Sequence, residues 1–403
     1  TVIEIGGQDS KLLILDRDPH TGQTILSDFS MNTLCAAGTG SFLDQQASRL
    51  GISIEEEFGE MALKSVHPPR VAGRCSVFAK SDMIHLQQIA TPDYDIVAGL
   101  CYAMARNYKS NIGKGKHFVK PIAFHGGVAW NKGVVKAFED ILELKSGELI
   151  IPEYCACMGA LGAILETLDK DLDSEFSGLT RLEEYLKHRA VDAVRLVPLS
   201  FKGDPNSRHY IGMGTHTPNK ENGERIKAYM GVDVGSISTN VVVIDEAGNV
   251  LSKRYLMTAG RPIEAVRKGI EEVGEEIGNA LDVLGVGTTG SGRYLIGDFV
   301  GADIVRNEIT AQANAAVFIE PDVDTIFEIG GQDSKYISID RGVVVDFEMN
   351  HACAAGTGSF LEEQAEKLGI SIKKEFGELA LAAELPLSLG ERCTVFMESD
   401  LVF

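Results

Sequence analysis

The sequence predicts an α/β fold in which mixed sheets are covered by layered helices, present as two partial copies of one module. Short runs rich in Val and Ile follow one another as hairpin strands at 229–234, 240–245 and 249–257. Helical and strand patterns then alternate along the chain, and hairpins followed by such alternation favour a mixed sheet over an all-parallel one. A long internal repeat indicates that the module occurs twice.

The other elements follow from the same periodicities. In the first half of the chain we expect a strand over 117–124 and a helix over 132–144. In the second half, the hairpin strands precede a helix over 261–277. The remaining expected elements are strands over 282–287, 325–329 and 336–340 and helices over 357–368 and 374–383.

The repeat consists of two long matching segments. Residues 4–11 recur unchanged as 328–335. Residues 35–63 and 353–381 are identical at 22 of 29 positions, and in both copies an Arg-Cys pair follows, its cysteine 40 residues after the first. A match of this length indicates a duplication.

Three segments are expected along the chain. Residues 1–168 would be the C-terminal portion of a first module, and residues 228–403 the N-terminal portion of a second. The stretch 169–227 is rich in charge, Gly, Pro and Asn, so we expect a linker there with one short helix at 182–188. Both ends of the chain lie inside apolar segments, as if each copy were cut from a longer protein.

The two copies are cut at different points, which raises a hypothesis about their assembly. Residues 229–327 and 1–168 together contain each motif described below once. These two pieces would then build one circularly permuted module, with 328–403 as a surplus copy.

Composition excludes several classes of partner. The formal net charge is −20, and an acidic surface argues against nucleic acids and anionic membranes. We find neither an apolar run of about 18 residues, the length that a membrane span needs, nor a secretion signal. Seven cysteines, an odd number, favour free thiols or metal ligands in a reducing compartment. We therefore expect a cytoplasmic protein.

Three glycine-rich turns follow expected strands, at 231–240, at 329–333 with its copy at 5–9, and at 125–131. Small residues let backbone N–H groups approach a phosphate, and Asp233, at a strand end, is placed to hold a Mg²⁺-bound water. One such turn is more often a plain strand connection, but three in this order favour a nucleotide site. None fits the P-loop or the dinucleotide fingerprint.

Two cysteines recur in each copy. Cys35 and Cys353 precede a Gly-Thr-Gly that opens a helix, and a helix N-terminus stabilises a thiolate. With Cys75 and Cys393 the two copies supply four thiolates, the number that a 4Fe–4S cluster takes. A zinc ion held by four cysteines and ordinary buried core cysteines are the alternatives. Three cysteines outside the repeat are expected to be core residues: Cys101, Cys155 and Cys157.

The order of these turns resembles the phosphate and adenosine motifs of the actin, sugar-kinase and heat-shock-chaperone ATPase superfamily, whose subdomains are ribonuclease-H-like. Within it, Cys-Ala-Ala-Gly-Thr-Gly and Arg-Cys-Thr-Val-Phe-Met-Glu-Ser-Asp are similar to one branch. That branch comprises the activators of 2-hydroxyacyl-CoA dehydratases and the ATPase subunits of benzoyl-CoA reductase. The resemblance covers nearly all of 1–168 and 229–403.

The resemblance implies ATP and Mg²⁺ as ligands. The residues implied to act in hydrolysis are Asp233, Asp333, Asp9, Gln332 and Gln8. The residues implied to contact the nucleotide are Gly235, Ser236 and Thr239 in the first phosphate motif, Gly330, Gly331, Gly6 and Gly7 in the second, and Gly126, Gly127 and Asn131 in the adenosine motif. The first copy lacks the first phosphate loop and the second lacks the adenosine loop, so neither forms a full ATP site alone, and the truncated chain need not turn over.

The resemblance also implies a function. ATP hydrolysis would change a subdomain angle and thereby the surroundings of a 4Fe–4S cluster held by Cys35, Cys75, Cys353 and Cys393, within one chain or between the chains of a homodimer. The electron would come from a ferredoxin or flavodoxin and pass to a 2-hydroxyacyl-CoA dehydratase or a related CoA-thioester reductase. A small-molecule kinase of the amino-sugar type, and a nucleotide-binding module without redox activity, remain as alternatives, because both need the loops but not the cysteines.

Overall fold

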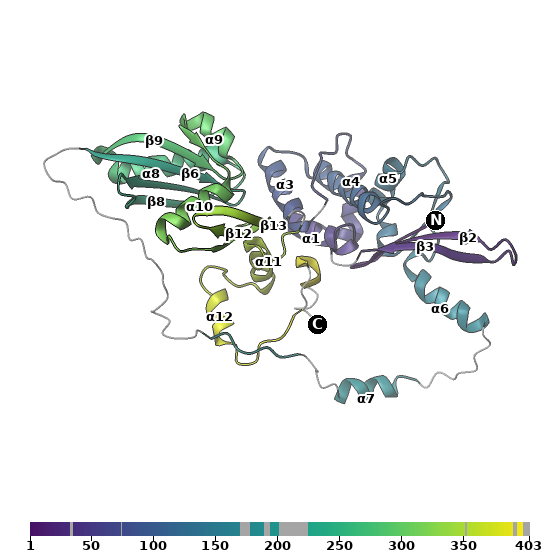
Figure 1. The fold of residues 1–403 in the computed structure, drawn as a ribbon. Coiled ribbons are helices and arrows are strands. Elements are labelled where there is room, and N and C mark those ends of the chain that lie inside the picture. Colours follow the sequence, from purple (N-terminus) through teal and green to yellow (C-terminus); the bar gives the residue numbers. More distant parts are fainter. Residues whose placement is uncertain are drawn as a thin grey trace. The chain divides into compact units, whose positions relative to one another are not determined.

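The computed structural model describes residues 1–32, 35–73, 75–169, 178–188, 194–200, 225–350, 353–389 and 393–397. The chain divides into two compact units (Figure 1). The first unit comprises Thr1–Ser200 and Gln364–Phe403, and the second comprises Phe201–Glu363. The last forty residues, which carry the end of the second copy, therefore group with the first copy.

The first unit is built on a five-stranded mixed sheet. Its strands lie in the order β3 (Thr24–Met31), β2 (Ser10–Arg17), β1 (Val2–Ile5), β4 (Ile122–His125) and β5 (Leu149–Ile150). The first three strands form antiparallel pairs, whereas β4 and β5 run parallel to β1. Three antiparallel strands followed by two parallel ones in the order 3-2-1-4-5 form the ribonuclease-H-like sheet.

Five helices share a core with this sheet: α1 (Gly40–Leu50), α2 (Gly59–Ala62), α3 (Ser76–Gln88), α4 (Asp93–Asn111) and α5 (Lys132–Ile141). The described part of this unit also contains α6 (Met158–Asp169), α7 (Thr180–His188) and α12 (Phe376–Ala382), which add no residue to that core. In the core, the ring of Phe138 on α5 meets Tyr108 on α4 and Phe124 on β4, with centroid separations of 5.3 and 5.2 Å. Edge-on aromatic pairs of this kind add to the stabilisation gained from burial.

The second unit contains a second sheet of the same topology. Its order is β8 (Val250–Met257), β7 (Ser238–Asp245), β6 (Ile226–Val234), β9 (Leu281–Thr289) and β10 (Ile304–Val305). The antiparallel pairs are β8–β7 and β7–β6, and β9 and β10 run parallel to β6. Helices α8 (Pro262–Ile277), α9 (Arg293–Val300) and α10 (Glu308–Ile319) belong to this unit. The predicted mixed α/β fold class is thereby confirmed for both sheets.

The second copy of the repeat begins with a three-stranded antiparallel sheet, β11 (Thr325–Ile329), β12 (Ser334–Asp340) and β13 (Val343–Met349), followed by α11 (Gly358–Leu368). These strands repeat β1, β2 and β3. In the first copy β4 pairs with β1, but within the described residues no strand pairs with the free edge of β11. Ile3 and Ile5 are fully buried, while the equivalent Phe327 and Ile329 are 77% and 66% exposed.

Most expected elements appear close to their expected bounds, and two boundaries were wrong. The strand expected over 117–124 begins only at Ile122. Pro121 stands just before it and has no N–H to donate to a neighbouring strand. The helix expected over 132–144 ends at Ile141, because Glu143 adopts a left-handed conformation, with φ of 54°.

The short helix expected at 182–188 is confirmed as α7, whereas most of the stretch expected to be a linker lies outside the described residues. None of the helices in the described ranges is long and apolar enough to cross a membrane.

Candidate functional site: two glycine turns, a cavity and the cysteine loops

The predicted first phosphate loop connects β6 to β7 in the second unit. The N–H of Gly235 donates to the carbonyl of Ser238 at 2.8 Å, which closes a tight turn. Ser236 is exposed on this turn, whereas Thr239 is fully buried. The hydroxyls of Thr239 and Thr258 lie 2.9 Å apart, so the Thr239 side chain supports the turn from inside.

Asp233, at the end of β6, lies where a negative charge is costly. Burial raises the pKa of Asp233, and the carboxylates of Glu328 and Glu308 raise it further, against the lowering effects of a hydrogen bond with Asn240 and of the charge of Lys335. Glu328 belongs to the strand before the second glycine turn, so the first and second predicted phosphate motifs meet in this unit. An acidic group of this kind gains from a divalent cation, which fits the predicted Mg²⁺ role of Asp233.

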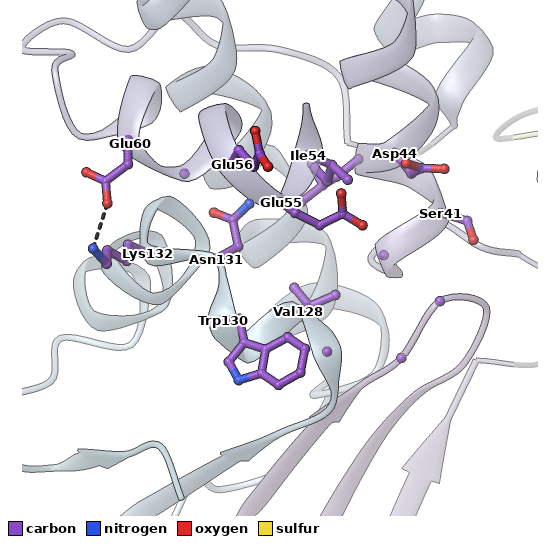
Figure 2. Close-up of a pocket in the computed structure, with 16 residues that line it drawn as sticks. Ser41, Asp44, Ile54, Glu55, Glu56, Glu60, Val128, Trp130, Asn131 and Lys132 are labelled. Atoms are coloured by element: carbon purple, nitrogen blue, oxygen red, sulfur yellow. Dashed lines mark hydrogen bonds and ion pairs between the residues drawn. The ribbon is translucent and has the colours of Figure 1, made fainter. Parts of the chain in front are cut away.

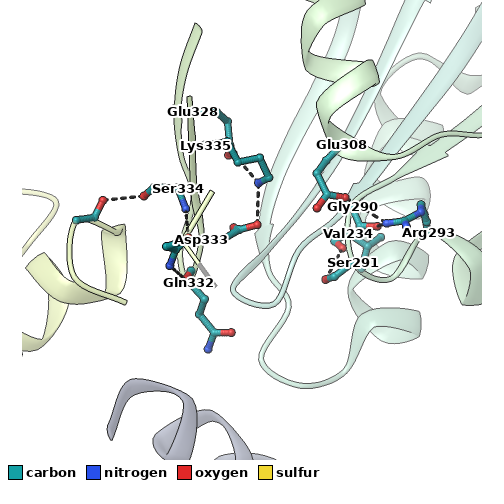
Figure 3. Close-up of polar contacts among 12 residues, drawn as sticks. Val234, Gly290, Ser291, Arg293, Glu308, Glu328, Gln332, Asp333, Ser334 and Lys335 are labelled. Atoms are coloured by element: carbon teal, nitrogen blue, oxygen red, sulfur yellow. Dashed lines mark hydrogen bonds and ion pairs between the residues drawn. The ribbon is translucent and has the colours of Figure 1, made fainter. Parts of the chain in front are cut away.

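The loop after β9 closes over Asp233. A side chain at Gly290 would place its Cβ 2.5 Å from Asp233 Oδ1, so only glycine fits there. Arg293, at the start of α9, donates to the Gly290 carbonyl at 2.8 Å and lies 3.2 Å from Glu308 (Figure 3). The sequence alone assigns no role to this loop. The structure places its Gly290 directly against the candidate metal-binding carboxylate of Asp233, which remains partly exposed.

The second glycine turn has the same geometry in both copies. The N–H of Gly6 donates to the carbonyl of Asp9, and the N–H of Gly330 to the carbonyl of Asp333, each at 2.8 Å. A side chain at Gly331 would come within 2.3 Å of Ile237, so this turn lies directly against the first phosphate loop. The first and second glycine turns therefore lie against each other in the second unit.

Lys335, on β12 just after this turn, is a residue whose contacts the sequence-based prediction missed. Its Nζ lies 2.7 Å from both Glu328 Oε2 and Asp333 Oδ2, and its side chain is only 3% exposed (Figure 3). Burial alone would lower the pKa of Lys335, but the hydrogen bonds with Asp333 and Glu328 outweigh it and leave the pKa raised. The signal was present in the sequence, because this lysine closes the recurring eight-residue segment.

In the first unit, the copy of this turn borders a cavity of about 570 Å³ (Figure 2). Gly6 and Gly7 line one side, and the adenosine motif lines another. The other lining residues are Gly40, Ser41, Leu43, Asp44, Ile54, Glu55, Glu56, Gly59, Glu60, Gly127, Val128, Trp130, Asn131 and Lys132. Of the predicted nucleotide contacts in this unit, Gly6, Gly7, Gly127 and Asn131 line the cavity and Gly126 does not. Gln8 and Asp9, which were predicted to act in hydrolysis, do not line it either.

The adenosine motif owes its shape to local bonds. Asn131 caps α5, and its side-chain oxygen accepts from the N–H of Val134 at 3.1 Å. Lys132 and Glu60 form an ion pair of 2.6 Å at the cavity wall. Trp130 is 67% exposed beside them, which leaves a flat aromatic surface available to a ligand.

The cysteine loops have matching geometry in the two copies. Cys35 Sγ accepts from the N–H of Ala37, and Cys353 Sγ from the N–H of Ala355, each at 3.4 Å. Cys75 and Cys393 are buried, while Cys35 and Cys353 are partly exposed. Within the described residues no three Cys, His, Asp or Glu side chains lie close enough to hold a metal ion. The four-cysteine site thus stays a prediction.

The three cysteines outside the repeat were expected in the core. Cys101 and Cys155 are buried, and burial raises the pKa of Cys101 to about 12, as for an inert core thiol. The prediction was wrong for Cys157, which is exposed. It follows Cys155 in a short 3₁₀ turn over Cys155–Cys157, and only the first residue of that turn faces the core.

Comparisons with known proteins agree with these motifs. Residues 1–167 and 230–403 match the BadF/BadG/BcrA/BcrD ATPase family. The chain is 36% identical over 176 residues to a 2-hydroxyisocaproyl-CoA dehydratase activator of Clostridioides difficile. That alignment covers 43% of this chain and 62% of that protein. It is 32% identical over 174 residues to the (R)-2-hydroxyglutaryl-CoA dehydratase activating ATPase of Acidaminococcus fermentans. This second alignment covers 43% of this chain and 65% of the ATPase.

A solved structure of the activator of the 2-hydroxyisocaproyl-CoA dehydratase from Clostridium difficile with bound ADPNP is also similar, at 30% identity and a TM-score of 0.38. That likeness covers 43% of this chain and 64% of the other. The chain thus spans less than two thirds of the length of these relatives. Since the family match takes in both copies of the repeat and leaves out only the stretch between them, the chain belongs to the BadF/BadG/BcrA/BcrD ATPase family.

Proposed function

We propose that this protein is an ATP-hydrolysing iron–sulfur activator that drives low-potential electrons into a 2-hydroxyacyl-CoA dehydratase or a related CoA-thioester reductase. Its family is one of ATPases, and two of its relatives are named for the activation of such dehydratases. One observation carries the proposal. The N–H of Ala36, next to Cys35, donates to Cys393 Sγ at 3.5 Å, so a repeated cysteine of the second copy lies at the cysteine loop of the first.

The repeated cysteines offer the donor atoms that an iron–sulfur cluster takes. Backbone N–H groups that donate to Sγ stabilise a thiolate over a thiol and tune the potential of a cluster that it binds. Such a bond reaches each of Cys35, Cys353 and Cys393. With Cys75 these are the four thiolates that would hold a 4Fe–4S cluster, which supplies a one-electron carrier when bound.

Each unit would contribute nucleotide-binding elements of its own. The cavity wall at Trp130 and Asn131 suits the base and ribose, and the Gly6–Gly7 turn suits the phosphates, which backbone N–H groups recognise. In the second unit, Asp233 would hold Mg²⁺ through water, and Gln332 and Asp333 of the second glycine turn would act in hydrolysis. A ferredoxin or flavodoxin in the cytoplasm would be the electron donor.

The test is iron and sulfide content with an electron paramagnetic resonance spectrum, measured after anaerobic reconstitution and reduction. We expect about four irons per chain or per dimer in the wild type and their loss in the Cys353→Ala, Cys393→Ala double variant. Cys157→Ala is the matched control, since it removes an exposed cysteine outside the repeat.

A folded protein that binds zinc instead would indicate a structural four-cysteine site. A folded protein without any metal would favour a small-molecule kinase or a nucleotide-binding module without redox activity. Either result would overturn the proposal.

A further inference from the structure

One asparagine joins the glycine turn to the cysteine loop in the first copy. Asn32 directly follows β3, and its side-chain Nδ2 donates to two carbonyls, that of Gln8 at 2.9 Å and that of Cys35 at 3.0 Å. Its Oδ1 accepts from the N–H of Ser10 at 2.7 Å. A single amide group thus holds the backbone of the phosphate-binding turn and the backbone of the predicted metal ligand.

The second copy repeats this arrangement in the other unit. Asn350 Nδ2 donates to the carbonyl of Gln332 at 3.1 Å and to that of Cys353 at 2.5 Å, and its Oδ1 accepts from the N–H of Ser334 at 2.7 Å. The burial of the surrounding strands differs greatly between the copies, as for Ile5 and Ile329. The same three side-chain bonds form in both copies although the burial of the strands differs. The local sequence motif therefore determines these bonds, and the packing around it does not.

The chemistry of the bonds requires an asparagine. Two donors and one acceptor on one planar group are used at the same time, and among short side chains only an amide offers both. Aspartate keeps the acceptor oxygen. In place of Nδ2 it has a second carboxylate oxygen, which would be repelled by the two carbonyl oxygens that Nδ2 binds. Serine has a single donor and alanine has none.

A parallel connection runs through the backbone. The N–H groups of Gly40 and Ser41, at the start of α1, donate to the carbonyls of Gly6 and Gly7 at 2.8 and 2.7 Å. The equivalent bonds of α11 join Gly358 to Gly330 and Ser359 to Gly331, each at 2.8 Å. The helix that follows each cysteine loop is therefore also bonded to the glycine turn. Of the helix bonds and the asparagine bonds, only the asparagine bonds reach the cysteine residue itself.

We propose that Asn32 and Asn350 are positioning residues that pass the state of the glycine turn to the cysteine of the same copy. When a phosphate binds the turn, the carbonyl of Gln8 or Gln332 moves with the turn, and the shared amide moves the backbone of Cys35 or Cys353 with it. This inference rests on the proposed function, since it requires a nucleotide at the turn.

The experiment uses the full chain without metal and with the Mg²⁺ complex of ADPNP as the probe. The alkylation rates of Cys35 and Cys353 by iodoacetamide are followed residue by residue with mass spectrometry, and nucleotide affinity is measured separately by calorimetry. In the wild type we expect the probe to change the rate at a responding cysteine by about fivefold, the low end of coupling between linked sites.

The variants are Asn32→Asp and Asn350→Asp, made singly. Measured at a probe concentration that saturates the variant by its own calorimetric affinity, each should abolish the response of the cysteine in its own copy and leave the other copy responding. Asn307→Asp is the matched control, because Asn307 caps α10 only through its Oδ1, which accepts from the N–H of Thr310 at 2.8 Å and is kept in aspartate. If an aspartate variant fails to fold, alanine at the same position removes the donors without opposing oxygens.

The outcomes separate the two proposals. Aspartate and alanine variants that respond like the wild type would overturn the positioning role alone, and so would nucleotide binding to the wild type without any change in alkylation rate. Absence of nucleotide binding to the wild type would overturn the proposed function together with this inference.

Discussion

Asp233 is an acidic residue whose surroundings make its charged form costly to the fold. Partial burial raises its pKa, and the charges of the carboxylates Glu328 and Glu308 raise it further. An acid whose pKa is raised on folding binds its proton more tightly in the folded state than in the unfolded one. The free energy of unfolding therefore falls as the pH rises from the ordinary value of 3.8 through the raised pKa.

We predict that Asp233→Asn raises the melting temperature at neutral pH and abolishes ATP turnover. The amide carries no charge in this acidic surrounding, and it offers a weaker ligand to Mg²⁺. Thermal melts between pH 4 and pH 7 should show a smaller fall in stability with rising pH for the variant than for the wild type. The control is Asp282→Asn on the exposed part of β9, and a lower melting temperature for the Asp233 variant would contradict the argument.

At the scale of the element, two adjacent glycines in the adenosine motif have opposite constraints. Gly126 directly follows β4 and has a φ of +90°. A Cβ at this position would lie 2.1 Å from the carbonyl oxygen of Ile5 on β1. A Cβ at Gly127 would meet no atom within 4 Å, and the φ of Gly127 lies outside the left-handed region. The neighbouring strands β1 and β4 can approach each other only because Gly126 has no side chain.

We predict that Gly126→Ala destabilises the protein by at least about 2 kcal/mol, because it combines a strained backbone with a backbone clash. Gly127→Ala should stay within about 0.5 kcal/mol of the wild type, as surface changes do. Urea unfolding of the two variants side by side is the measurement. Equal effects would mean that the strand pair adjusts more easily than the close approach to Ile5 indicates.

Local patterns predicted the elements well, and tertiary contacts explain what they missed. The hairpin β6–β7–β8 followed from runs of Val and Ile, and the turns followed from glycines. The bridge that Asn32 forms between Gln8 and Cys35 joins segments whose proximity no local pattern contains. The exposure of Cys157 depends on which residue of one short turn faces the core, and residue type alone does not decide that.

At the scale of the whole molecule, the two units have separate cores. The first core gathers around β1, β4, α4 and α5, and the second around β6, β7 and α8. Each unit also contains one complete five-stranded sheet. The hypothesis of a circularly permuted module needs these two sheets to share one nucleotide, and it stays a prediction. The absence of binding at millimolar ATP would count against it.

We predict two transitions in differential scanning calorimetry, because units with separate cores need not unfold together. Asp233→Asn should raise only the transition of the second unit, and Gly126→Ala should lower only that of the first. The double variant should therefore move the two transitions apart or together, depending on their order in the wild type. A single transition that shifts as one in every variant would show that the units unfold cooperatively.

Trp130 is the only tryptophan in the chain, and it stands at the wall of the cavity in the first unit. All indole emission therefore originates from this one location, and the second unit is silent at wavelengths that excite tryptophan alone. Trp130 is thus an intrinsic fluorescence probe of the first unit. The emission maximum of Trp130 during heating follows the unfolding of the first unit only. The emission intensity during a nucleotide titration reports whether a base stacks on this wall.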